Sequence, residues 1–273
     1  MKDKGVNNLE EEKRNKLETL LYAHGVRDVC LKNESKEIMM FECPSGSEIR
    51  IASNGTLGGY AMKGQELCAL TAKHIAGGEK QVKLVMPQNG EIVIGEVLTA
   101  PQEIPHDTPV DILAAKLSKT VDETRLWSLN RQQMRSRVFD FVHGNTDDLQ
   151  DRDVYIWGAR TRPGLGKITM ADFVRNDMLR CIVIEDVSHD VRDGIMSTLQ
   201  EEYPKRPFFA REGDSGSIVC AETGEGTNVI AIAMLMGLKV QCDEDSPRQY
   251  MAFYLQQGLR QLEIGHNQTF ELC

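Results

Sequence analysis

The 273-residue sequence lacks any apolar run close to the roughly 20 residues that a membrane-spanning helix needs. It also lacks the apolar core of a signal peptide, because Met1-Lys2-Asp3-Lys4 leads into a polar stretch. Basic residues are in deficit, 32 against 41 acidic ones, which gives a formal net charge of −9. Nucleic-acid-binding surfaces are normally basic. We therefore expect a soluble, cytoplasmic protein with neither a membrane nor a nucleic acid as its partner.

Paired cysteines are missing as well. The seven cysteines are scattered and odd in number, and none forms a C-x-x-C pair. The sequence therefore carries no zinc or redox signature, and we expect neither a metal nor a cofactor. Reduced, mostly buried thiols in a reducing compartment are the simplest interpretation.

Short β-type runs dominate the chain from residue 26 to residue 255. We predict strands over the following ranges: 26–31, 37–42, 48–52, 81–86, 91–97, 154–157, 166–170, 179–184, 217–221, 228–236 and 249–255. Asn89-Gly90 between two of these runs is a strong hairpin signal. Two groups of short strands on either side of a connector favour an all-β fold built from two packed β-barrels.

Helical spacing is confined to a few segments. We predict helices over 8–24, 188–203 and 256–263, and a helix or irregular crossover rather than strands over 122–151. The chain is accordingly divided into four parts. These are an N-terminal extension of helix and hairpin (1–47), a first barrel (48–125), a connector (126–150), and a second barrel with a C-terminal helix (151–273).

A serine stands on a glycine-rich turn in Gly213-Asp214-Ser215-Gly216-Ser217, ahead of a β-branched run. Glycine permits the backbone angles of a tight turn and leaves room for a substrate. Such a turn can direct the N–H groups of Gly213 and Ser215 at one point, as an oxyanion hole does. The same pentapeptide could form an ordinary turn between two strands, so its meaning depends on a base and an acid elsewhere in the chain.

His74 is the strongest candidate for the base among the six histidines. It follows the buried-type run Leu67-Cys68-Ala69-Leu70-Thr71-Ala72, and a strand end is a rigid mount for a catalytic side chain. A serine hydroxyl is a weak nucleophile until such a base takes its proton. Alone, His74 would be read as a surface histidine after a strand.

Asp111 is our candidate for the acid that orients this base. It stands at the head of the apolar run Ile112-Leu113-Ala114-Ala115, and a carboxylate entering a core needs a partner. Asp107, four residues earlier, is the rival. Asp111 could alternatively cap the start of a strand by accepting a backbone N–H.

The segments Thr71-Ala72-Lys73-His74, Asp111-Ile112-Leu113-Ala114 and Gly213-Asp214-Ser215-Gly216, in this order and spacing, resemble the signature blocks of trypsin/chymotrypsin-like serine proteases. The resemblance extends over roughly residues 48–263 and is to divergent, intracellular-type members. It implies two six-stranded antiparallel barrels with a catalytic triad of His74, Asp111 and Ser215 between them. It also implies an acyl-enzyme, with the oxyanion held by the N–H groups of Gly213 and Ser215.

The sequence departs from the digestive members of that family. Ile75 and Arg211 stand where they have half-cystines, and no Arg/Lys-Ile-Val-Gly-Gly activation site precedes the first barrel. We therefore hypothesise that Asp214 is satisfied internally, or that activation depends on a partner protein or cleavage.

The resemblance places Phe209 at the floor of the substrate pocket and Met236 and Gly237 in its wall. A phenyl group there would not neutralise a basic side chain, so we expect a small or apolar P1 residue; Phe209 could equally be ordinary core. The leading interpretation is an active serine endopeptidase acting on a protein or peptide. The alternative is a weakly active or inactive protein of this fold that acts as a regulatory or binding module, with an activating or inhibitory protein partner.

Overall fold

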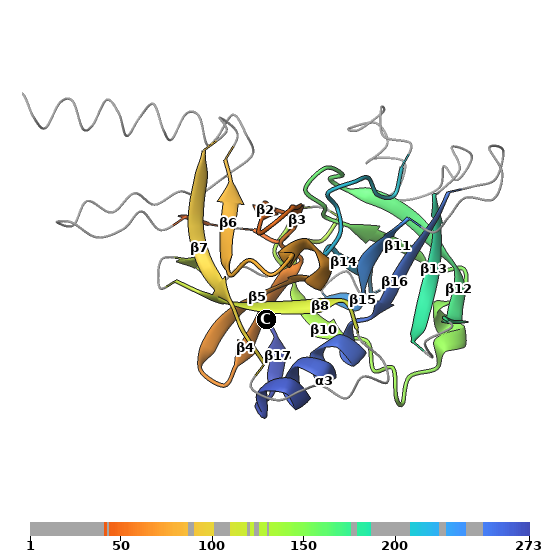
Figure 1. The fold of residues 1–273 in the computed structure, drawn as a ribbon. Coiled ribbons are helices and arrows are strands. Elements are labelled where there is room, and N and C mark those ends of the chain that lie inside the picture. Colours follow the sequence, from red (N-terminus) through yellow and green to blue (C-terminus); the bar gives the residue numbers. More distant parts are fainter. Residues whose placement is uncertain are drawn as a thin grey trace, which may run out of the picture.

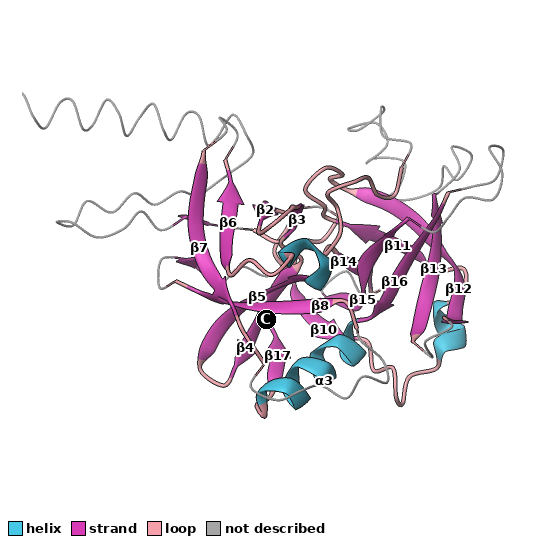
Figure 2. Ribbon diagram, viewed as in Figure 1, coloured by secondary structure: helices cyan, strands magenta, loops and turns pink. Residues whose placement is uncertain are grey.

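The computed structural model describes residues 41–42, 44–86, 90–100, 110–118, 121–122, 126–129, 131–175, 179–186, 208–223, 228–238 and 248–273. The helices predicted over 8–24 and 188–203 and the strand predicted over 26–31 lie outside these residues. Strands dominate the part that is described (Figure 2). No helix within it is long and apolar enough to cross a membrane.

The first sheet is a curled half-barrel of eight strands, in the order β17-β4-β5-β8-β7-β6-β2-β3. It occupies one half of the molecule, with β6 and β7 on the side away from the second sheet (Figure 1). β6 and β7 form the hairpin predicted around Asn89-Gly90. Its strands have these bounds: β2 (Glu48–Arg50), β3 (Asn54–Thr56), β4 (Gly59–Lys63), β5 (Glu66–Ala72), β6 (Gln81–Val85), β7 (Glu91–Val97), β8 (Ile112–Leu117) and β17 (Phe270–Leu272).

The second sheet is a closed barrel of six strands with a seventh at its side. Its order is β10-β15-β14-β11-β12-β13-β16, and pairing between β15 and β16 closes the barrel. Its strands have these bounds: β10 (Arg135–Val138), β11 (Asp153–Ile156), β12 (Gly164–Val174), β13 (Arg180–Asp186), β14 (Ile218–Glu222), β15 (Asn228–Leu238) and β16 (Gln249–Tyr254). The predicted two-barrel fold is therefore confirmed, with one barrel closed and the other open.

The connector differs from its prediction. Residues Arg135–Val138 form the strand β10, which pairs in parallel with β15, and a short 3₁₀ helix η2 follows at Thr146–Leu149. The apolar residues here have helical spacing because they serve two different cores. Met134 and Val138 pack on the core between the sheets, whereas Phe139 packs on the core inside the second barrel.

The C-terminus returns to the first sheet. Helix α3 (Leu255–His266), longer than the predicted 256–263, leads into β17, which pairs antiparallel with β4. At the other end, β1 (Phe41–Glu42) pairs in parallel with β9 (Val121–Asp122). Gly258 on α3 allows close packing, because a Cβ there would lie 2.8 Å from Ile112 at the start of β8.

Both sheets and α3 share a hydrophobic core, which includes Leu70 and Ile112 from the first sheet, Phe253 from the second and Leu259 from the helix. Two further cores fill the individual barrels. Cys68, Cys181 and Cys220 are buried, and burial raises the pKa of the Cys68 thiol to about 11. The shared core fixes the ends of β5, β8 and β14 relative to one another, and these ends carry the candidate catalytic residues.

Candidate active site

His74 lies in the 3₁₀ helix η1 (Lys73–Ala76), which directly follows the buried strand β5. Its neighbour Ile75 is buried, and the carbonyl of Ile75 accepts hydrogen bonds from the N–H groups of Ala52 and Ser53 at 3.0 and 3.1 Å. The His74 side chain remains 48% exposed. The fold thus fixes the backbone of His74 and leaves its imidazole accessible.

Asp111 holds His74 with both carboxylate oxygens. Oδ1 accepts the backbone N–H of His74 at 2.8 Å, and Oδ2 lies 2.6 Å from Nδ1 of the ring. An ionised carboxylate can only accept, so Nδ1 carries the proton and Nε2 is left as the basic nitrogen. The hydrogen bond to Asp111 raises the pKa of His74, against the opposing effect of burial. The rival Asp107 lies outside the described residues.

The Ser215 turn has two glycines in the left-handed region, Gly213 with φ +94° and Gly216 with φ +93°. Gly216 also has no room for a side chain, since a Cβ would lie 2.6 Å from Thr71 Oγ1. Thr56 anchors the turn by donating its N–H to the Ser215 carbonyl at 2.9 Å and its hydroxyl to the Gly213 carbonyl at 2.9 Å. The turn therefore lies against β3 and β5 of the other sheet.

Ser215 and Ile75, the neighbour of His74, both lie next to Gly55. A Cβ on Gly55 would lie 2.5 Å from Ile75 Cδ1 and 3.4 Å from the Ser215 carbonyl, so the neighbour of His74 and the serine contact the same residue. Ser215 Oγ donates to the Met236 carbonyl at 3.2 Å. Within the described residues, no hydrogen bond joins Ser215 to His74. Catalytic hydrogen bonds are often long or unformed without substrate.

The N–H groups of Gly213 and Ser215 have no acceptor within the described part of the chain. The next N–H, that of Gly216, is taken by the Leu235 carbonyl at 3.0 Å. Two unpaired donors beside a serine are the feature expected of an oxyanion hole.

Asp214 is completely buried and fully hydrogen-bonded within the protein. Oδ1 accepts the backbone N–H groups of Arg160 and Thr161 at 2.7 and 3.2 Å, and Oδ2 accepts the Thr161 hydroxyl and the Arg211 N–H at 2.6 and 2.8 Å. Gly158 makes room for this carboxylate, because a Cβ there would lie 2.3 Å from Oδ1. These four hydrogen bonds support the hypothesis that Asp214 is satisfied within the protein.

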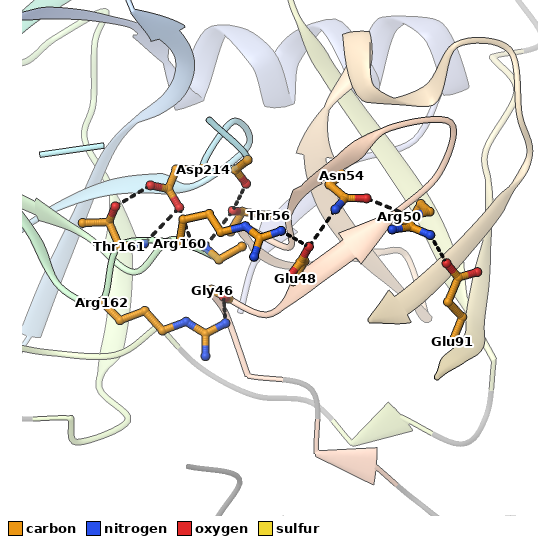
Figure 3. A network of polar contacts seen from close by, with 12 residues as sticks. Gly46, Glu48, Arg50, Asn54, Thr56, Glu91, Arg160, Thr161, Arg162 and Asp214 are labelled. Carbon is orange, nitrogen blue, oxygen red and sulfur yellow. Dashed lines mark hydrogen bonds and ion pairs between the residues drawn. The ribbon is translucent and has the colours of Figure 1, made fainter. Parts of the chain in front are cut away.

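The turn between β11 and β12 connects Asp214 to the first sheet, as Figure 3 shows. Arg160 donates from Nη2 to Glu48 on β2 at 2.6 Å, and Arg162 donates to the carbonyl of Gly46 at 2.8 Å. Asn54 donates to Glu48 at 2.8 Å and accepts from Arg50, which also pairs with Glu91. A chain of polar contacts thus extends from Asp214, the residue beside Ser215, to Glu91 on β7 of the first sheet.

A cavity of about 330 Å³ opens beside Ser215. It is lined by Ala210, Arg211, Glu212, Gly213, Ser215, Leu235, Gly237, Arg248 and Tyr250. Of the two residues expected in the pocket wall, Gly237 lines this cavity, whereas Met236 contributes its carbonyl to Ser215 and packs its side chain on the shared core.

Phe209, expected at the pocket floor, is completely buried and does not line the cavity. Its ring packs against Tyr250, with centroids 5.4 Å apart, in the core of the second barrel. Burial of a large aromatic ring accounts for this position better than contact with substrate. Sequence reasoning missed Arg248 and Tyr250, which follow a segment without a recognisable motif. Tyr250 lies on β16, and the pairing of β16 with β15 brings it to the cavity.

These strands, turns and buried contacts form the two-barrel fold of the chymotrypsin-like serine proteases. A glutamic acid-specific serine protease has a similar structure, with a TM-score of 0.55 and 12% identity over 85% of this chain and 100% of that chain. The chymotrypsin of Cellulomonas bogoriensis matches with a TM-score of 0.50 and 14% identity, over 85% and 99% of the two chains. A homologue of alpha-lytic protease matches with a TM-score of 0.50 and 13% identity, over 81% of this chain and 97% of that chain.

No family model matches the sequence, and no curated protein matches it. At such low identity the structural likeness establishes the fold. Among the described residues, no group of three or more His, Cys, Asp and Glu side chains could hold a metal ion.

Proposed function

We propose that the protein is a serine endopeptidase that hydrolyses peptide bonds through His74, Asp111 and Ser215. The double contact of Asp111 with His74 carries the proposal, because it fixes the ring and leaves Nε2 as the base. The unpaired N–H groups of Gly213 and Ser215 support it. Neither feature is needed to hold the two sheets together.

In the proposed reaction Ser215 Oγ leaves the Met236 carbonyl and attacks the carbonyl carbon of the peptide bond, while His74 Nε2 takes its proton. The oxyanion accepts hydrogen bonds from Gly213 and Ser215. His74 then gives the proton to the leaving amine, and the C–N bond breaks to leave an acyl-enzyme. Water attacks this ester with His74 again as the base, and Asp111 remains ionised throughout.

Labelling with a fluorophosphonate probe tests the proposal. The native chain should react, Ser215→Ala should not, and Ser136→Ala should react like the native chain because Ser136 lies on β10 and bonds the Cys273 carbonyl. Peptide cleavage should disappear in Ser215→Ala and His74→Ala. A native chain that neither labels nor cleaves would contradict the proposal.

A second candidate is a binding or regulatory protein of the same fold without useful turnover. The hydrogen bond from Ser215 Oγ to the Met236 carbonyl favours it, because that bond directs the hydroxyl away from a base. An activating protein would then have to release the serine. Labelling of Ser215 in the isolated chain excludes this candidate, whereas labelling only after a partner is added supports it.

A further inference from the structure

The cavity beside Ser215 has the position of a pocket for the substrate side chain at P1, on the acyl side of the cleaved bond. Gly213 and Ser215, which would hold that carbonyl, form part of its lining. The following inference rests on the proposed function and concerns the chemical class of that side chain.

Two arginines give the cavity a cationic lining. Arg211 and Arg248 are both exposed, and both guanidinium groups lie by the ring of Phe208, with Cζ 5.2 and 3.9 Å from its centroid. Stacking on an aromatic ring holds a guanidinium in place without consuming its hydrogen-bond donors. Within the described residues, neither arginine has a carboxylate at ion-pair distance. The pocket therefore presents two oriented cations that form no ion pair within the described part of the chain.

Tyr250 adds an unused polar group to the same lining. Tyr250 is 2% exposed, and its hydroxyl is buried without a hydrogen bond of ordinary length in the described structure, although it interacts with the Asp186 carboxylate. A ligand atom that accepts a hydrogen bond would satisfy this hydroxyl, whereas an aliphatic P1 side chain would not.

Two acidic groups lie near these donors. Glu212 lines the cavity but is exposed to solvent, which screens its charge. Asp186 interacts with Tyr250 and Arg248, but it is absent from the cavity lining and accepts the N–H of Phe209.

We propose that the pocket binds an acidic P1 side chain, glutamate or aspartate. The carboxylate would pair with Arg248 and accept from the Tyr250 hydroxyl, while Arg211 adds positive charge. Carboxylate and guanidinium match in geometry and charge. This preference replaces the small or apolar P1 residue expected from the sequence, which depended on Phe209 facing the substrate.

A set of fluorogenic peptides that differ only at P1 (Glu, Asp, Gln, Leu, Ala and Lys) tests the proposal. We expect the native chain to cleave after Glu at least about 10-fold faster, in kcat/KM, than after Gln, as for a charge-assisted hydrogen bond. Arg248→Met should bring the Glu/Gln ratio close to one. Tyr250→Phe should lower it by a smaller factor. The control Arg137→Met, an exposed arginine on β10, should leave the ratio unchanged.

Fluorophosphonate labelling separates the two proposals. Labelling of Ser215 together with faster cleavage after Leu or Ala than after Glu overturns the acidic pocket and leaves the serine protease standing. If neither labelling nor cleavage occurs, the pocket is tested by the affinity of Ser215→Ala for the Glu and Gln peptides. Equal affinities overturn the acidic pocket, and tighter binding of the Glu peptide supports it without catalysis.

Discussion

Arg160 and Glu48 form an ion pair of 2.6 Å that connects the turn around the buried Asp214 to the first sheet. The aliphatic part of Arg160 also covers Gly213, since a Cβ on that glycine would lie 3.2 Å from Arg160 Cγ. The backbone N–H of the same arginine bonds Asp214. Arg160 therefore lies beside Gly213 and also contacts the buried Asp214 and the opposite sheet, and Figure 3 shows the last two of these contacts.

We expect Arg160→Met to lower kcat by about 10-fold with a smaller change in KM, because the side chain that covers Gly213 loses the ion pair with Glu48 that holds it in place. Loss of one oxyanion donor costs roughly 10²–10³ in kcat, and a loosened donor should cost less. The free energy of unfolding should fall by less than about 1 kcal/mol, since the ion pair is partly exposed. Steady-state kinetics and urea unfolding measure the two effects.

Glu48→Gln removes the charge but keeps an acceptor for Arg160, so it should have an intermediate effect on kcat. Lys116→Met is the matched control, because Lys116 pairs with Glu66 on the surface of the first sheet, away from Gly213. Equal losses of kcat in the control and in Arg160→Met would contradict a positioning role for Arg160.

Asp214→Asn should lower both activity and stability. Three of the four hydrogen bonds to this carboxylate come from backbone N–H groups, and an amide nitrogen would face one or more of these donors. Leaving buried donors unsatisfied costs about 1–3 kcal/mol, which urea unfolding would detect. The turn that presents Gly213 and Ser215 should then loosen, and fluorophosphonate labelling should slow.

Asp172→Asn provides the comparison, because Asp172 is exposed and pairs with Arg180 on the surface of the second barrel. Its stability should change by less than about 1 kcal/mol. Unchanged labelling and unfolding in Asp214→Asn would show that the buried charge is dispensable.

The sequence predicts the strands well where side chains alternate on one core and poorly where they do not. β7 has the predicted bounds, because its residues face the core of a single barrel. β10 is missed because neighbouring apolar residues enter two different cores. Burial of Phe209 could not be foreseen either, because it depends on Tyr250, a residue 41 positions later that arrives through strand pairing.

The pH dependence of kcat/KM should report His74. The hydrogen bond to Asp111 raises the pKa of His74 above its ordinary value of about 6.5. The base must be neutral, so activity should fall as the pH drops through this raised pKa.

In Asp111→Asn the carboxylate is lost, and activity at neutral pH should fall on the order of 10⁴-fold because the wrong tautomer forms.

The same pKa shift affects stability with the opposite pH trend. A histidine whose folded pKa is raised stabilises the native state fully below its unfolded pKa, and this contribution disappears as the pH rises through the folded pKa. The free energy of unfolding should therefore lose the contribution of His74 as the pH rises, and His74→Ala should abolish that part of the profile. An apparent pKa at or below 6.5 in the kinetic profile of the native chain would contradict the coupling to Asp111.

Gln261 on helix α3 fixes the segment that carries Asp111, because its carboxamide accepts the N–H of Val110 at 2.7 Å and donates to the carbonyl of Val110 at 3.3 Å. These groups are buried, and the Val110 carbonyl also accepts the N–H of Ile112 at 2.9 Å, so Gln261→Leu leaves the Val110 N–H unsatisfied and should cost about 1–3 kcal/mol of unfolding free energy. Gln261→Glu keeps the acceptor and should cost less. At temperatures where both variants remain folded, kcat should fall more in Gln261→Leu than in Gln261→Glu. Gln257→Leu, four residues earlier on the same helix, is the control. If the Gln261 variants lose stability but keep kcat and its pH profile, the helix supports the fold without positioning Asp111.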